Sequence, residues 1–221
     1  MALPRPVKAV IFDMDGLLID SEVVYIEALA AEALARGRDL PLPVIKSMIG
    51  HAWPSSALLL AEHFGPELDT DDFRDRATER FYQLVQAGVA LKAGVLEILD
   101  HLDAVSLPRA VATSGRRVDV EHHLGSHDLM PRFHAVLAFG DYPRPKPHPD
   151  PYLHAAAALG VDPADCLALE DSHNGVRAAA AAGMMTVMVP DMLDPTEEMR
   201  SLCVRIARDL HEVQTLIRAA G

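Results

Sequence analysis

The sequence predicts an α/β fold, with a Rossmann-like parallel sheet core and an inserted all-helical cap domain. Short apolar runs typical of strands buried on both faces recur along the chain, beginning at 7–12. Helical patterns separate most of these runs, and this alternation favours a parallel sheet with helices on both faces. Between about residues 17 and 91 the pattern is helical, with no strong strand. Because an ordinary connection is only a few residues long, this insertion predicts a lid or binding module.

The elements follow one another in a simple order. The predicted strands are short and mostly apolar, and span 7–12, 109–112, 135–139, 166–169, 186–189 and 203–207. The helices expected to cover the sheet span 95–102, 118–124, 151–159, 175–182 and 212–220. The insertion is expected to hold helices at 22–36, 43–49, 55–63 and 71–87. These elements predict a core domain of residues 1–16 and 92–221 and a helical cap domain of residues 17–91.

Composition excludes several classes of protein. Of the 221 residues, 50% are hydrophobic, which supports a sizeable core and rules out disorder over most of the chain. The formal net charge is −12 and there is no dense Lys/Arg cluster, so we expect neither nucleic-acid binding nor attachment to an anionic membrane. No apolar run approaches the roughly 20 residues of a membrane-spanning helix, and the first residues do not resemble a signal peptide.

Cysteine and histidine usage predicts a reduced, cytoplasmic setting without a zinc site. Cys166 and Cys203 fit no zinc-binding spacing. The local group of His122, His123 and His127 shows no metal-ligand spacing that we recognise, so we interpret these histidines as mostly surface residues.

The first strand leads into two aspartates, Asp13 and Asp15, with Gly16 after them. Residues two apart in an extended chain point the same way, so the two carboxylates can converge on one site at the carboxyl end of the sheet. A divalent cation can hold one as an anion while a less polar environment lets the other carry a proton. The alternative is an ordinary turn, since Asp and Gly are common after strands.

Three later segments place complementary groups after strands. Thr113, Ser114 and Gly115 offer a hydroxyl, an amide and room for close approach to a phosphate, although this motif by itself favours a helix N-cap for Arg116 onward. Lys146 lies in a proline-rich loop that either fixes its ammonium group or is an exposed extended linker. Glu170 and Asp171 are oxygen ligands that suit Mg²⁺, or else an acidic surface turn.

Taken together and in order, these motifs resemble the haloacid dehalogenase superfamily, most closely its phosphatase and β-phosphoglucomutase branch. The resemblance is carried by 13–22, Thr113, Lys146-Pro147 and 170–172, and extends from Val7 to about Val189. It implies that Asp13 is the nucleophile and a Mg²⁺ ligand, and that Asp15 is the general acid and base with its carbonyl on the metal. It also implies that Thr113 and Lys146 hold the phosphoryl group, that Asp171 with Glu170 completes the metal site, and that the Lys146–Pro147 bond is cis.

The expected function is a Mg²⁺-dependent phosphatase acting on a small phosphorylated metabolite through an aspartyl-phosphate. The acid/base residue Asp15 favours phosphate esters over haloacids, because dehalogenases of the superfamily lack it. A β-phosphoglucomutase-like mutase is the alternative, but the sequence has Tyr25 where such chains have a histidine, and no lysine between Lys46 and Lys92. Because a mutase must grip a second phosphate, we favour hydrolysis.

Further binding residues are expected in both domains. In the core we assign phosphate or substrate binding to Met14, Ser114 and Gly115, and in the cap to His51 and Trp53, where a tryptophan can stack on a sugar or simply pack between helices. Arginines 74, 76 and 80 stand among acidic residues and are interpreted as a solvated helix face. We expect a monomer or a homodimer, with a small molecule as the partner.

Overall fold

The structure is a computed structural model and describes residues 3–48, 53–86 and 88–219. The chain divides into two compact units, one formed by Met1–Ile19 with Leu91–Gly221 and the other by Asp20–Ala90. The predicted boundaries at 16/17 and 91/92 differ slightly from this division. Residues 17–19 stay with the first unit because Gly16 N donates to Ile19 O (2.9 Å) and Ile19 forms β-bridges with Asp15 and Leu91.

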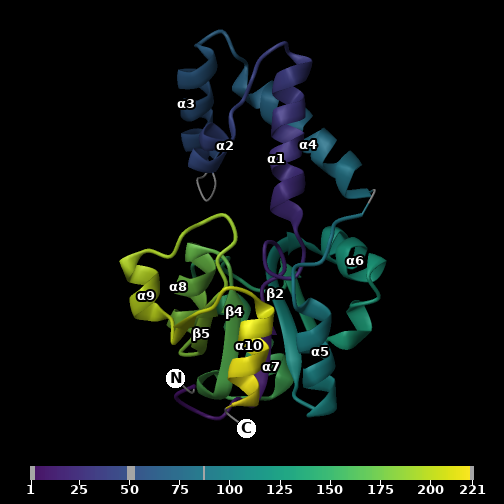
Figure 1. Ribbon diagram of the computed structural model, residues 1–221, viewed down its shortest axis with the longest axis vertical. Coiled ribbons are helices and arrows are strands. Elements are labelled where there is room, and N and C mark those ends of the chain that lie inside the picture. Colours follow the sequence, from purple (N-terminus) through teal and green to yellow (C-terminus); the bar gives the residue numbers. More distant parts are fainter. Residues whose placement is uncertain (1–2, 49–52, 87, 220–221) are drawn as a thin grey trace. The chain divides into compact units, whose positions relative to one another are not determined.

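The first unit contains a six-stranded sheet with the order β3-β2-β1-β4-β5-β6, and all its strand pairs are parallel (Figure 1). The predicted α/β fold class is confirmed. The strands are β1 (Ala9–Phe12), β2 (Arg109–Arg116), β3 (Ala135–Phe139), β4 (Cys166–Glu170), β5 (Met185–Met188) and β6 (Arg205–Ile206). β2 runs beyond its predicted end at 112, since its pairing with β3 resumes at Arg116 after a register shift.

Helices cover both faces of this sheet, as alternation along the chain predicts (Figure 1). They are α5 (Val95–Ala104), α6 (Arg117–Ser126), α7 (Asp150–Leu159), α8 (His173–Ala181), α9 (Glu197–Leu202) and α10 (Leu210–Arg218). Alanines of α7 and α8 pack on small residues of β1, β2 and β4, which lets helix and sheet approach closely. The short helix α9 is absent from the sequence-based prediction.

The second unit is helical, as predicted for the cap. Its helices are α1 (Ser21–Ala35), α2 (Leu42–Met48), α3 (Trp53–Phe64) and α4 (Thr70–Gln86). They enclose a separate apolar core that includes Leu29, Leu60 and Phe73. Glu32 is buried on α1 and accepts hydrogen bonds from Arg36 and Arg80 (both 2.7 Å), so Arg80 is not part of a purely solvated face.

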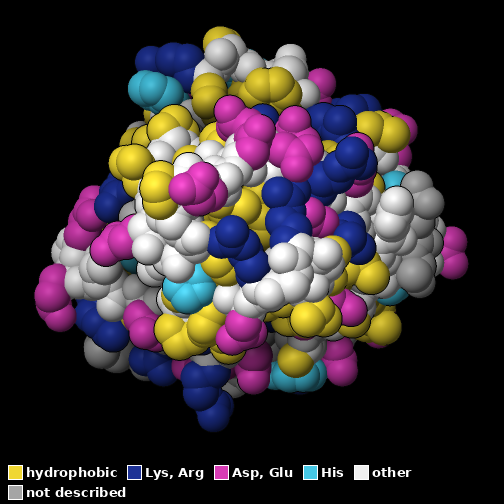
Figure 2. All heavy atoms as spheres, turned by 90° about the horizontal axis from the view of Figure 1, so that it is seen from above, with side chains coloured by type: hydrophobic (Ala, Val, Ile, Leu, Met, Phe, Trp, Pro, Cys, Tyr) yellow, Lys and Arg dark blue, Asp and Glu magenta, His cyan; other side chains and the backbone are white. Residues whose placement is uncertain are grey.

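Surface charge is mixed. On the face drawn in Figure 2, Lys and Arg side chains lie among Asp and Glu side chains. No described helix is long and apolar enough to cross a membrane.

Candidate active site

The candidate site lies in the first unit, at the carboxyl end of the two central strands. β1 and β4 are neighbours whose registers pair Phe12 with Leu169, and Asp13 N donates to Leu169 O (3.0 Å). Asp13 therefore leaves β1 beside Glu170 and Asp171, which end and follow β4. In this strand order the connection changes direction between β1 and β4, which is where open α/β sheets bind their ligands.

Lys146 joins the carboxylates of these two strands. It lies in the loop between β3 and α7, and its Nζ is 2.5 Å from Asp13 Oδ1 and also donates to Glu170 Oε1. The Lys146–Pro147 peptide is cis, as the resemblance implied. The ammonium and both carboxylates are almost completely buried. The proline-rich segment is itself mostly exposed, but it places the Lys146 side chain in the buried cluster.

Burial and neighbouring charge shift the protonation of this cluster. Burial raises the pKa of Asp13, Lys146 lowers it, and the Glu170 and Asp15 carboxylates raise it again, so that the pKa is about 7. For Lys146, burial alone would lower the pKa, but the charges of Asp13 and Glu170 together raise it above the usual range. The ammonium group is therefore a permanent cation at the site.

Glu170 is held by four hydrogen-bond donors. Its Oε1 accepts from Lys146 and from the Tyr152 hydroxyl (2.7 Å), and its Oε2 accepts from the backbone N (3.1 Å) and Oγ (3.0 Å) of Ser172. Gly175 makes room for this carboxylate, because a Cβ at that position would lie 1.8 Å from Glu170 Oε1. The Glu170 side chain is 0% exposed, and these four hydrogen bonds hold it in place.

The carboxylates of Asp13, Glu170 and Asp171 form a candidate metal site. One oxygen of each lies within 4.8 Å of the others, and all three residues are buried. Gly16, with φ +75°, allows the close approach, since a Cβ there would lie 2.4 Å from Asp171 Oδ2. An all-oxygen donor set suits a hard divalent cation such as Mg²⁺. The resemblance implied that Asp15 reaches the metal through its backbone carbonyl. Its side-chain carboxylate is not in this cluster.

Asp15 instead lies beside the hydroxyl of Thr113, with Asp15 Oδ2 and Thr113 Oγ1 3.5 Å apart. Thr113 Oγ1 accepts from Gly115 N (3.0 Å), and the backbone carbonyl of Thr113 accepts from the Tyr142 hydroxyl (2.8 Å). These bonds fix a hydroxyl donor next to the predicted acid and base. Residues 113–115 therefore belong to the last part of β2, and the N-cap position of α6 is taken by Arg116.

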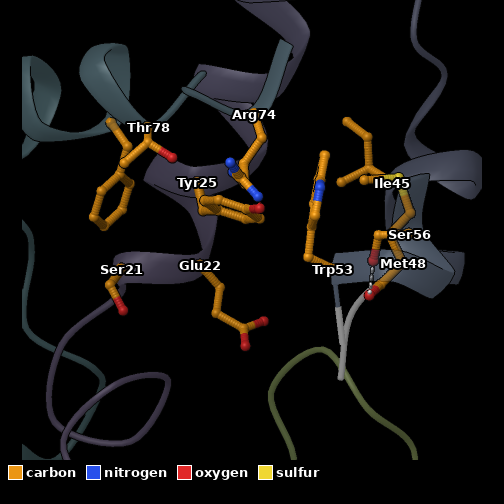
Figure 3. Close-up of a pocket in the computed structure, with 10 residues that line it drawn as sticks. Ser21, Glu22, Tyr25, Ile45, Met48, Trp53, Ser56, Arg74 and Thr78 are labelled. Carbon is orange, nitrogen blue, oxygen red and sulfur yellow. Dashed lines mark hydrogen bonds between the residues drawn. The ribbon is translucent and has the colours of Figure 1, made fainter. Parts of the chain in front are cut away.

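The remaining predicted binding residues differ in what they can offer. Ser114 is exposed and Gly115 is half-buried. Met14 is only 1% exposed, so any contribution to phosphate binding must come from its backbone N–H. In the helical unit, Trp53 lines a pocket with a volume of about 450 Å³ (Figure 3), whereas His51 lies outside the described residues.

Sequence reasoning missed two tyrosines of the site. Tyr152 lies in α7 among apolar residues, and its ring also lies 5.2 Å from Lys146 Nζ. Tyr142 stands in the proline-rich loop. Neither belongs to a motif, because each acts through a contact made only once α7 and the loop pack against the sheet. Of the histidines predicted to be mostly surface residues, His122 is exposed and His127 half-buried, whereas His123 is buried in α6.

Comparison with known proteins adds to this geometry. The sequence matches the haloacid dehalogenase-like hydrolase family over residues 7–183. It is 35% identical to Hexitol phosphatase B of Escherichia coli, over 86% of each chain. It is also 35% identical to a "Probable pseudouridine-5'-phosphatase" of Drosophila melanogaster, over 85% of this chain and 83% of that one. The structure resembles a HAD family hydrolase of Deinococcus radiodurans with bound phosphate and sodium, with a TM-score of 0.83 and 27% identity over 98% and 97% of the two chains.

Proposed function

The chain belongs to the haloacid dehalogenase-like hydrolases, and on that premise we propose that it is a Mg²⁺-dependent phosphatase that hydrolyses a small phosphomonoester through an aspartyl-phosphate. The family and its relatives make it a phosphatase-related enzyme. The observation that carries the finer proposal is the cluster of Asp13, Lys146 and Glu170, with Asp171 within ligand distance. It combines a carboxyl group that can serve as the nucleophile, a buried cation and an oxygen-rich ion site.

In the first half-reaction the Asp13 carboxylate oxygen forms a bond to phosphorus and the bond from phosphorus to the ester oxygen breaks. Asp15 donates its proton to the departing oxygen. Lys146 and the Thr113 hydroxyl stabilise negative charge on the phosphoryl oxygens. When bound by Asp13 and Asp171, Mg²⁺ would supply further charge stabilisation on these oxygens.

In the second half-reaction a water attacks the phosphorus of the aspartyl-phosphate. Asp15, now ionised, accepts the proton of that water, the bond from Asp13 to phosphorus breaks, and inorganic phosphate is released. Glu170 does not touch the substrate in this scheme. It keeps Lys146 in place, because its own oxygens are held by Tyr152 and Ser172.

The test compares phosphate release from p-nitrophenyl phosphate by the wild type, Asp13→Asn and Asp100→Asn, with and without Mg²⁺. Asp100 is a matched control because it lies on α5 with an exposed side chain and pairs only with arginine in the contacts observed. We expect Asp13→Asn to lose activity by roughly 10³-fold or more, as for other nucleophile losses, and the control to keep it. Equal rates for Asp13→Asn and the wild type would disprove the proposal.

Asp15→Asn tests the covalent intermediate directly. Because p-nitrophenolate is a good leaving group, we expect this variant to release about one equivalent of it per enzyme in a rapid burst and then turn over slowly. The phosphate would remain on the protein, where mass spectrometry detects it on the peptide that contains Asp13. A slow linear release without a burst, and without labelled peptide, would contradict the aspartyl-phosphate.

A further inference from the structure

Asp191 is a carboxylate near the candidate metal site that neither the sequence motifs nor the proposed reaction uses. It lies three residues after the end of β5, and β5 is the neighbour of β4 in the sheet. Val189 N donates to Glu170 O (2.7 Å), which continues the pairing of the two strands to their carboxyl ends. Asp191 therefore reaches the same edge of the sheet as Glu170 and Asp171, and all these residues belong to the first unit.

The two oxygens of the Asp191 carboxylate have different surroundings. Oδ1 accepts from Lys92 Nζ (2.7 Å), in an ion pair whose side chains are 14% exposed for Asp191 and 25% for Lys92. Oδ2 is buried as well, but it has no hydrogen-bond partner among the described residues. Because a buried carboxylate oxygen without a donor is unfavourable, its position indicates a donor that does not belong to the chain.

Asp191 Oδ2 lies close to one carboxylate of the candidate metal site. A Cβ added to Gly16 would lie 3.4 Å from Asp191 Oδ2 and 2.4 Å from Asp171 Oδ2. The sum of the two distances, 5.8 Å, is the greatest separation that these oxygens can have, and one water molecule can bridge a gap of that size. Two carboxylates this close repel each other unless a cation or a hydrogen-bond donor lies between them.

A cavity with a volume of about 250 Å³ lies beside this carboxylate. Its lining includes Gly16, Lys92, Asp191 and Arg208, so that charged and backbone groups face it from several elements. A cavity that is polar and of this size can hold several water molecules. Gly16 is both part of this lining and the point of close approach to Asp171, so water in the cavity would lie next to the metal site.

We propose that Asp191 is a positioning residue of the metal site, which accepts through Oδ2 a hydrogen bond from a water molecule that bound Mg²⁺ retains. The proposal rests on the Mg²⁺-dependent function above. Mg²⁺ usually keeps several waters when proteins bind it through one or two carboxylates. Groups that hydrogen-bond to the ligands of a metal orient them and raise its affinity. Lys92 fixes the Asp191 carboxylate through Oδ1 and leaves Oδ2 for the water.

The alternative is an ion pair that only stabilises the fold. Such a pair explains the contact of Lys92 with Oδ1, but it explains neither the burial of Oδ2 without a donor nor its closeness to Asp171. The two roles also predict different measurements. Loss of a purely structural pair lowers Tm and leaves the affinity for Mg²⁺ unchanged, whereas loss of a positioning residue weakens the binding of Mg²⁺ itself.

The test measures Mg²⁺ affinity by isothermal titration calorimetry of the metal-free protein, without any substrate. Asp191→Ala should weaken Mg²⁺ binding roughly tenfold or more, as the loss of other outer-shell partners does. Asp191→Asn keeps the shape but loses the charge, and should weaken binding to a smaller extent. Asp165→Ala is the matched control, because Asp165 forms an ion pair of the same kind with Lys8 (2.8 Å) at the opposite, amino end of β4. Its affinity for Mg²⁺ should equal that of the wild type.

Turnover should show the same effect as a shift in the metal requirement. In the hydrolysis of p-nitrophenyl phosphate, Asp191→Ala should need about tenfold more Mg²⁺ for its half-maximal rate. Its kcat at saturating Mg²⁺ should change less, since Asp191 does not touch the substrate in this scheme.

The possible failures can be told apart. An Asp191→Ala protein that binds Mg²⁺ as tightly as the wild type and the Asp165→Ala control would overturn the role of Asp191, whatever its Tm, and leave the phosphatase function intact. If Asp191→Ala does not fold by circular dichroism, Asp191→Asn decides, and an affinity equal to that of the wild type again overturns the inference. A wild type that neither binds Mg²⁺ nor needs it for hydrolysis would overturn the metal-dependent function and this inference with it.

Discussion

Replacing Gly175 by alanine should displace the Glu170 carboxylate and so reduce both stability and activity, although an alanine ordinarily stabilises a helix. Gly175 is in the first turn of α8, where Gly→Ala would normally contribute up to about 1 kcal/mol. A Cβ at this position would lie 1.8 Å from Glu170 Oε1 and 2.1 Å from Oε2. Because the Glu170 side chain is fully buried, it can move only by giving up some of its four donors.

The magnitude follows from that loss. Hydrogen bonds to a charged group contribute about 1.5–3 kcal/mol each, so the loss of two costs roughly 3–6 kcal/mol. After the helix-propensity gain, we expect the free energy of unfolding to fall by roughly 2–5 kcal/mol. For a chain of this length that lowers Tm by about 5–15 °C. Lys146 loses its contact with Glu170 Oε1, so kcat should fall by roughly 100-fold.

Gly125→Ala is the matched control for this measurement. Gly125 is near the end of α6 and is exposed, and a Cβ added at this position would meet nothing within 4 Å. Its replacement should leave kcat unchanged and raise Tm slightly. Both variants are assayed by urea denaturation and by steady-state hydrolysis of p-nitrophenyl phosphate. A Gly175→Ala enzyme as stable and as active as the Gly125→Ala control would refute the argument that Glu170 must keep its position.

Five more outcomes are expected. Lys146→Met should lower kcat roughly 100-fold or more at saturating Mg²⁺, because the phosphoryl oxygens lose their buried cation. The pKa of Asp13 in the folded, metal-free protein is about 7, above its ordinary value of 3.8. Because the folded state holds this proton more tightly than the unfolded state, the protonated carboxyl stabilises the fold fully below about pH 4, and this stabilisation is lost as the pH rises through 7. Urea denaturation in EDTA at several pH values measures the change. Since a metal ion competes with that proton, Mg²⁺ should raise Tm more at pH 8 than at pH 6. Tyr152→Phe removes one donor to Glu170 and should reduce the free energy of unfolding by about 1–3 kcal/mol in denaturant titrations. Glu32→Gln in the cap weakens two charge-assisted hydrogen bonds (both 2.7 Å) and should lower Tm with kcat for acetyl phosphate unchanged.

The sheet was predictable because its strands are buried on both faces. β1 and β4 consist of residues with no exposure, and runs of that kind carry a clear signal. The signal fails where burial is slight. Helix α9 buries only Met199 and begins after a Thr196 cap whose side chain accepts from Met199 N, so its six residues show no helical periodicity. The last strand is likewise reduced to Arg205–Ile206, which are exposed and half-buried.

The part of the candidate site that lies at the ends of the strands could be predicted from the sequence. Asp13, Glu170 and Asp171 stand at the ends of adjacent parallel strands, and topology brings such residues together whatever the rest of the fold. The supporting contacts were not predictable. Tyr152 reaches Glu170 from a helix on the sheet face, a distance of 18 residues along the chain, and no periodicity marks which helical residue will do so.

The sum of charges supports the proposal that these residues act together with a cation. Four carboxylates, those of Asp13, Asp15, Glu170 and Asp171, meet one ammonium, that of Lys146, for a formal sum of −3 in a largely buried region. A region of that charge cannot readily admit a phosphate dianion. Without a metal ion, Asp13 retains a proton up to about pH 7, as its raised pKa indicates. A protonated carboxyl is a poor nucleophile.

A divalent cation at Asp13 and Asp171 would remove both obstacles together, because it reduces the formal sum to −1 and displaces the proton from the nucleophile. The same two residues would therefore govern substrate binding as well as the chemical step. It follows that removal of Mg²⁺ should weaken binding of inorganic phosphate, measured by calorimetry, and not only slow turnover. Equal phosphate affinity in Mg²⁺ and in EDTA would show that Lys146 alone suffices to attract the anion, and that the metal acts later in the reaction.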